Sequence, residues 1–175
     1  GFIRSRQQPA MANAGSGAGG GTSAQRSALN GVLGGAATGA SAPLLIGSAD
    51  YDAFERLLGE IQTAYSREDA DALGEMTTPE MLSYFSEELT RNTSLGDLNQ
   101  ISDVKLLQGD LAEAWSEDED EYATVSMRFS LNDRIVAREG GRLIEQLPSE
   151  ATELWTFRRA RGGNWILSAI QQKED

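Results

Sequence analysis

The spacing of apolar residues changes once along the chain. Between residues 51 and 89 they recur at intervals of three and four, and after Gly96 they recur at every second position. The first spacing is that of amphipathic helices, and the second is that of half-buried strands. Because the helices all precede the strands, the pattern predicts an α+β domain. Its N-terminal helices would pack on one face of a curved antiparallel sheet.

Three helices are predicted in the first part. The apolar face of the first consists of Phe54, Leu57, Leu58, Ile61 and Tyr65. The segment SRED at residues 66–69 has the spacing of a capping box and predicts the start of the second helix. Thr78 and Pro79 are typical of the N-cap and first position of the third helix, which RNTSLG at residues 91–96 should end.

The strand pattern is clearest in YATVSMRFSL at residues 122–131. One face of this segment carries Ala123, Val125, Met127, Phe129 and Leu131. Polar residues alternate with them after Tyr122, as in an antiparallel strand with one buried face. Gly109 predicts a bulge or bend in the strand before, and Gly140 and Gly141 predict a hairpin turn in the segment after.

Two tryptophans mark a final predicted hairpin at residues 151–172, with its turn in ARGG. The residues expected to share a face of its first strand are Glu153, Trp155 and Phe157. In its second strand they are Trp165, Leu167 and Ala169, with Ile166 and Ile170 opposite. Four side chains of this hairpin are expected to belong to the structural core: Trp155, Phe157, Trp165 and Leu167.

Charge divides the chain into two parts. The formal net charge is −12, but residues 1–49 contain three arginines and no acid, so the part from Asp50 onward carries −15. Such a body is repelled by nucleic-acid phosphates, and no nucleic-acid partner is expected. Runs such as GSGAGGG cannot bury enough apolar surface to offset backbone ordering. We therefore expect residues 1–49 to be a flexible Gly/Ala/Ser-rich tether and residues 50–175 to be the folded domain.

The first residues, GFIRSRQQP, place an apolar pair before Arg4 and Arg6. This is typical of the end of a membrane helix with its basic flank, or equally of a boundary without meaning. With the first interpretation a membrane anchor precedes Gly1. The domain then lies on the cytoplasmic side, because basic flanks stay there.

The chain has no cysteine and no histidine. Disulfides, thiol catalysis and zinc sites are therefore excluded, and the usual general base near neutral pH is missing. The acidic run at residues 117–121 lacks the spacing of a calcium loop and predicts a solvated turn. No catalytic residue, cofactor or metal site is expected.

The final hairpin combines Glu153, Trp155 and Phe157 with Asn164, Trp165, Leu167, Ile170 and Gln171. This set resembles the closing hairpin of the Tim44-like domain family. The helical stretch from FERLL to TTPEML and the strands ISDVKLLQGDLAEAW and YATVSMRFSL are also similar to that family. The resemblance covers residues 50–172 and implies a cystatin-like, or nuclear-transport-factor-two-like, cone without catalytic residues.

The family includes the mitochondrial inner-membrane import-motor scaffold, and its bacterial membrane-anchored relatives match this layout best. The resemblance implies a non-catalytic protein-interaction or scaffold module for protein transport, tethered to the bacterial inner membrane, with membrane-associated proteins as partners. The import-motor scaffold has a region that recruits a chaperone, and its first helices bind lipid. The resemblance does not extend to these two properties. The lead is a Gly/Ala/Ser sequence, and residues 50–73 are acidic.

Two alternatives stay open at the level of sequence. The cone could hold a small apolar ligand, or an enzyme could use a buried Asp beside a tyrosine, of which Tyr65, Tyr84 and Tyr122 are available. The candidate partner or pocket surface lies on the helices and consists of Phe54, Leu57, Leu58, Ile61, Tyr84 and Phe85.

Overall fold

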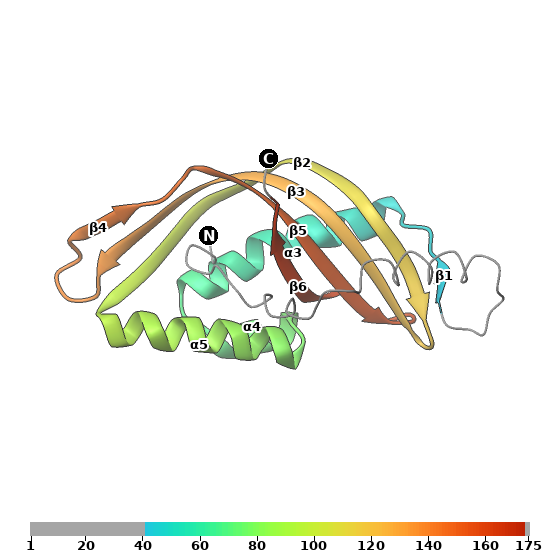
Figure 1. Cartoon of the computed structure of the whole chain (residues 1–175), viewed down its shortest axis with the longest axis horizontal. Helices are drawn as coiled ribbons and strands as arrows, with labels where there is room; N and C mark the ends of the chain where they lie inside the picture. The colour runs from blue at the N-terminus through green and yellow to red at the C-terminus, as the bar shows by residue number, and fades with distance from the viewer. Residues whose placement is uncertain (1–40, 174–175) are drawn as a thin grey trace, which may run out of the picture.

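A strongly curved sheet arches over the helices in the computed structural model, which describes residues 41–173 (Figure 1). In this part of the chain a short strand is followed by three helices and then by five strands. The α+β prediction is confirmed, including the order of helices before the main strands. The prediction of a tether falls mostly on residues 1–40, which lie outside the described part.

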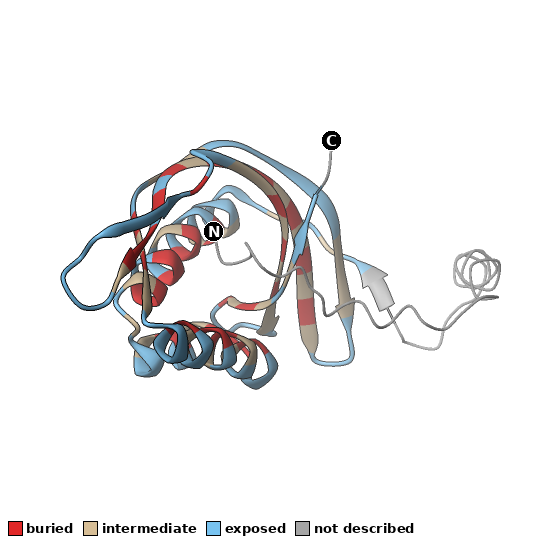
Figure 2. Ribbon diagram, turned by 60° about the vertical axis from the view of Figure 1, so that its left-hand side comes forward, coloured by how far each residue is buried: buried red, intermediate tan, exposed pale blue. Residues whose placement is uncertain are grey.

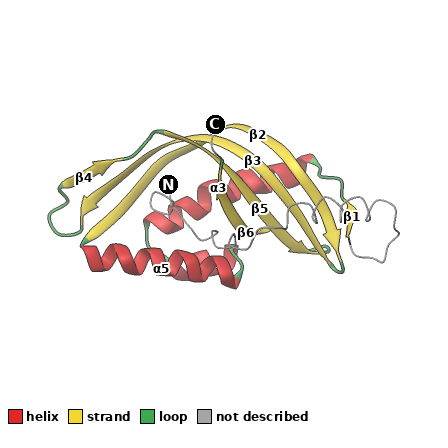
Figure 3. Ribbon diagram, in the orientation of Figure 1, coloured by secondary structure: helices red, strands yellow, loops and turns green. Residues whose placement is uncertain are grey.

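The six-stranded sheet is antiparallel, with strand order β1-β2-β3-β5-β6 and β4 paired beside β3. Its strands are β1 (Ser41–Pro43), β2 (Asp97–Glu117), β3 (Asp120–Ala137), β4 (Leu143–Gln146), β5 (Glu150–Ala160) and β6 (Ile166–Gln172). The arch is formed by β2 and β3, which are 21 and 18 residues long (Figure 3). The solvated turn predicted in the acidic run joins these two strands.

The helices are α3 (Ser48–Ser66), α4 (Ala70–Met76) and α5 (Pro79–Leu95). The predicted start of α5 is confirmed, since the Thr78 side chain accepts a hydrogen bond from the Met81 N–H and Pro79 follows directly. Its predicted end is also confirmed. Gly96 adopts the left-handed conformation, φ 78°, that terminates helices and favours glycine.

The predicted start of α4 is wrong by three residues. Its N-cap is Asp69, whose Oδ1 accepts a 3.0 Å hydrogen bond from the Ala72 N–H, and not Ser66. Ser66 is instead the last residue of α3, and its hydroxyl accepts a hydrogen bond from the Ile101 N–H of β2. This contact with a distant strand occupies the hydroxyl that a capping box at Ser66 would need.

The described body begins before Asp50. β1 pairs with the end of β2, from Ser41 opposite Glu117 to Pro43 opposite Trp115, and α3 starts at Ser48. The last residues of the expected tether therefore belong to the sheet and to the first helix.

The irregularity predicted at Gly109 is found on both sides of that residue and not at the residue itself. Gly109 itself pairs with Met127, whereas the register of β2 shifts after Ser102, after Leu106 and after Leu111. Bulges of this kind increase strand twist and bending. They allow a strand as long as β2 to curve around the helices.

A bulge also changes the predicted faces of β6. Phe157 lies opposite Leu167, but Thr156 lies opposite Ala169, so one residue of β6 is skipped. Ile170 consequently faces Trp155 on the inner side, and Ala169 lies on the outer side. The prediction that Leu167 and Ala169 share a face is therefore wrong, because it assumed an unbroken alternation.

The core lies between the inner face of the sheet and the helices (Figure 2). Phe54 of α3 stacks on Phe157 of β5, with ring centroids 4.5 Å apart and an interplanar angle of 13°. It also meets Trp165 edge-on at 5.1 Å. These rings fasten the first helix to the last hairpin.

Candidate functional site

The predicted partner surface is mostly interior. Five of its six side chains, all except Tyr84, are at most 2% exposed and belong to the core: Phe54, Leu57, Leu58, Ile61 and Phe85. Tyr84 is half-buried. The apolar faces of α3 and α5 pack under the sheet, because that burial is what holds the helices in place. They do not form a surface that a partner can reach, although Leu58 also borders the groove described below.

The four hairpin residues expected in the core, Trp155, Phe157, Trp165 and Leu167, are at most 5% exposed. Each indole N–H has a carboxylate acceptor. Trp155 Nε1 donates to Glu153 at 2.8 Å, and Trp165 Nε1 donates to Asp50 at 3.0 Å. Both tryptophans therefore combine buried area with a satisfied polar group.

Asp50 joins the start of α3 to this hairpin. Its carboxylate accepts hydrogen bonds from the Gly47 N–H, from Trp165 and from Arg159. Burial alone would raise the pKa of Asp50, but these hydrogen bonds and the Arg159 charge lower it overall. Arg159 also donates to Glu121 at 2.7 Å and lies over the Trp165 ring, 4.3 Å from its centroid. The cluster therefore ties the start of α3 to the last hairpin through hydrogen bonds and an ion pair.

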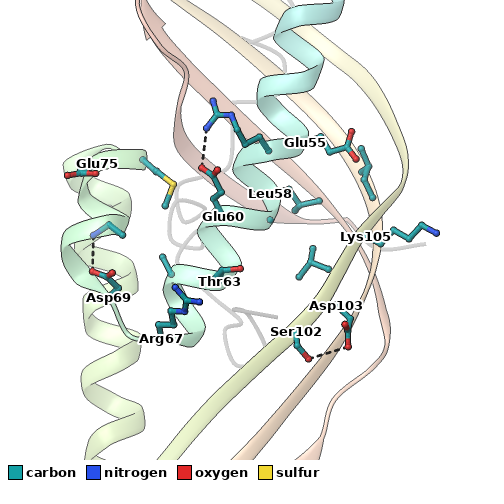
Figure 4. A pocket seen from close by; sticks show the side chains of 17 residues that line it. Glu55, Leu58, Glu60, Thr63, Arg67, Asp69, Glu75, Ser102, Asp103 and Lys105 are labelled. Carbon is teal, nitrogen blue, oxygen red and sulfur yellow. Dashed lines mark hydrogen bonds and ion pairs between the residues drawn. The ribbon is translucent and has the colours of Figure 1, made fainter.

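An open groove of about 880 Å³ lies on the outer side of α3 (Figure 4). Its floor is α3, one wall is α4 and the other wall is β2 at residues 102–106. The lining includes six small or apolar side chains: Leu58, Ala64, Ala72, Met76, Val104 and Leu106. Gly59 and Thr63 lie on the floor between the two walls.

Carboxylates outnumber cations around the groove. The acids are Glu55, Glu60, Asp69, Glu75 and Asp103, and the bases are Arg56, Arg67 and Lys105. Arg56 is already paired with Glu60 at 3.1 Å. Glu55 and Glu75 have no hydrogen bond or ion pair within the described residues. The groove is thus suited to a partner that brings positive charge.

Two buried carboxylates border a second, smaller pocket of about 210 Å³, which lies near the start of β5. Asp133 and Glu153 are each 1% exposed. Asp133 accepts a 2.7 Å hydrogen bond from Asn99, and Glu153 accepts from Trp155 and Gln172. Burial raises the pKa of Glu153 and the nearby Asp133 raises it further, while the hydrogen bonds from Trp155 and Gln172 lower it.

Glu153→Gln is expected to raise the melting temperature at neutral pH. Because the folded state raises the pKa of Glu153, the contribution of this group to stability is fully present below the unfolded carboxyl pKa of about 4.3. That contribution is lost as pH rises through the folded value. The amide keeps an acceptor for Trp155 but carries no charge. Thermal melts at about pH 4.5 and 7.5 check this, since the gain over the parent should grow with pH.

The control for this prediction is Glu113→Gln, at an exposed position of β2. Its effect should be small and should not grow with pH. If Glu153→Gln lowers the melting temperature at both pH values, the ionised carboxylate is needed as an acceptor and the prediction is wrong.

The fold and the groove define a class of domain: a curved antiparallel sheet with helices on its inner face and an open, charged groove on the outer side of its first main helix. The family model for the Tim44-like domain matches residues 49–172, and the chain belongs to this family. Membership supports a membrane-associated domain that acts through contacts with other proteins. No curated protein matches the chain.

One similar solved structure is the intermembrane space region of the chloroplast protein ARC6. It is 13% identical, with a TM-score of 0.48, and the match covers 75% of this chain and all 100% of that one. Within residues 41–173, no helix is long and apolar enough to cross a membrane. The same residues contain no group of three or more acidic side chains arranged to hold a metal ion.

Proposed function

We propose that this domain is a non-catalytic scaffold module that works at a membrane, and that a segment of a partner protein docks in the α3 groove. The observation that carries the proposal is the groove itself. It is broad and open, and its lining combines apolar side chains with charged ones. That combination resembles the apolar centre and polar rim of protein–protein interfaces.

The alternatives have less support. The pocket beside Asp133 and Glu153, at about 210 Å³, is smaller than the roughly 300–1,000 Å³ typical of ligand sites. The groove has a volume within that range, but it is open and eight of its lining side chains are charged, which does not suit a small apolar ligand. Neither this pocket nor the groove is lined by a tyrosine, so neither offers the Asp and Tyr pair that the enzyme hypothesis requires.

The finer proposal is that the domain is attached to the bacterial inner membrane and faces the cytoplasm, where it organises membrane-associated proteins of a transport system. The supporting observations are the family membership and the basic residues Arg4 and Arg6, in a lead without acids.

Attachment is not expected to come from the acidic body. At about 0.15 M salt the chain should sediment with cardiolipin vesicles no more than with uncharged vesicles, because a body of −15 is repelled by anionic lipid. A vesicle-sedimentation assay with both lipids checks this. Strong binding to cardiolipin alone would contradict it and would assign direct membrane docking to the domain.

The docking function can be tested by site-specific photo-crosslinking in cells. A crosslinker at the exposed Thr63 in the groove should capture a defined protein, whereas one at Thr156 on the outer face of β5 should not. The captured protein must then bind the purified chain directly. Equal capture at both positions, or no binding in the purified system, would reject the groove as the docking site.

A further inference from the structure

Gly59 has no explanation in the packing of the fold. It lies in the interior of α3, where glycine costs about 1 kcal/mol relative to alanine. Its backbone does not have the positive φ that would require glycine. A Cβ built at this position would have no atom within 4 Å apart from its two chain neighbours and the adjacent backbone of α3. The isolated domain would therefore be more stable with alanine here.

The position of Gly59 indicates what the missing side chain permits. Glu55, Gly59 and Thr63 are spaced by four residues, so they form one ridge along α3, and all three line the groove. Because glycine has no side chain, the surface of α3 is lower at this point of the ridge, between the walls formed by α4 and β2. Another main chain can then come closer to α3 than a larger side chain would allow, as small residues do in tight helix pairs.

An extended strand is a poor occupant of this groove. The edge of β2 along residues 102–106 could in principle pair with one, but the register there shifts after Ser102 and again after Leu106. Asp103 has φ 56°, which interrupts the regular ladder. Bulges of this kind block edge pairing. The floor of the groove is a helix whose own hydrogen bonds are closed, so an occupant that satisfies its backbone internally fits best.

The charge of the occupant follows from the lining. The groove is lined by five carboxylates and three cations, and one of the cations, Arg56, is already paired with Glu60. Glu55 on the floor and Glu75 on the α4 wall have no partner within the described residues. We propose that the groove takes a helix of a partner protein, with small or apolar side chains against Gly59 and with lysine or arginine toward Glu55 and Glu75. This inference rests on the docking function proposed above.

The test uses the full chain and an amphipathic peptide of about 18 residues with an Ala/Leu face flanked by lysines. A second peptide carries glutamate in place of each lysine. Gly59→Leu should weaken binding of the first peptide at least about tenfold, since it fills the lowered ridge. Ser83→Leu, at an exposed position of α5, is the matched control and should change binding less than about twofold.

Gly59→Ala separates a docking role from a purely structural one. It should raise the melting temperature by about 3–6 °C through helix propensity and still weaken peptide binding. The double variant Glu55→Gln, Glu75→Gln should lower affinity and its salt dependence, whereas Asp110→Asn, Glu113→Gln, outside the groove, should not. NMR shift changes should map to residues 55–63, 72–76 and 102–106.

Four outcomes would overturn the inference. The lysine peptide could bind Gly59→Leu as well as the parent, or the glutamate peptide could bind equally. The variant with Arg4, Arg6 and Arg26 changed to Gln could bind the lysine peptide more than about tenfold tighter, which would mean that the chain's own lead occupies the groove. Finally, a partner captured at Thr63 could dock through an acidic or extended segment. That last result would leave the docking function in place and reject only the basic helix.

Discussion

Replacing Trp155 with alanine is expected to lower the free energy of unfolding by roughly 3–5 kcal/mol, the usual cost of truncating a large buried aromatic side chain. Trp155 is 0% exposed, and its indole N–H is a donor to the buried Glu153. The variant therefore loses packing and also removes a hydrogen bond from an interior carboxylate. Against a total stability of about 5–15 kcal/mol, this loss could unfold the domain. Thermal and denaturant melts measure it.

The chain contains a matched control for this substitution. Trp115 is half-buried on the outer face of the sheet, where it stacks on Tyr122 with centroids 5.0 Å apart. Trp115→Ala should cost only about 1 kcal/mol, the contribution of a partly exposed aromatic pair. Trp165→Ala, at 5% exposure, should behave like Trp155→Ala. If Trp155→Ala and Trp165→Ala both melt within a degree or two of the parent, the hairpin is not the core wall and becomes a candidate binding surface.

Phe54→Ala should also cost roughly 3–5 kcal/mol, although the sequence makes this residue a candidate for a partner or pocket surface. Phe54 is 2% exposed and stacks against Phe157 while meeting the edge of Trp165. Its removal would leave a cavity where α3, β5 and the segment before β6 meet. The melting temperature should fall together with any partner binding, because the fold that carries the groove is lost.

A surface residue would respond differently. Phe54→Ala would then keep the parent melting temperature and lose only the interaction, which would contradict its placement in the core. Tyr51→Ala is a suitable comparison one helical turn earlier, since Tyr51 is 38% exposed and touches Phe54 only edge-on at 6.0 Å. It should cost far less than Phe54→Ala.

The elements that the sequence predicts correctly are those with local causes. Thr78 and Pro79 start α5 and Gly96 ends it through contacts within a few residues. The alternation in residues 122–131 matches the buried face of β3. The errors arise where distant contacts decide. Ser66 could cap α4 as far as local spacing shows, but its hydroxyl is held by Ile101 of β2. The face of Ala169 depends on a bulge that only pairing with β5 defines.

The candidate site is harder to predict for a physical reason. An apolar stripe on a helix marks the side that will be buried, so it does not identify a surface that remains available for partners. The groove lies on the opposite, polar side of α3, and its walls come from α4 and from a strand far along the sequence. The one local signal is Gly59 in a helix that is otherwise regular, a position where glycine weakens the isolated domain.

The Asp50 cluster also determines how the domain would bear mechanical force. The chain enters the body through β1, a three-residue strand paired with the far end of β2, and reaches α3 directly afterwards. Tension along the preceding segment therefore loads the few hydrogen bonds of β1 first. The next resistance is Asp50, which is fastened to Arg159 and Trp165 on the last hairpin. Through these contacts of Asp50 the force would pass into the sheet. The part of α3 that forms the groove floor, which follows Asp50 in the chain, would then carry less of it.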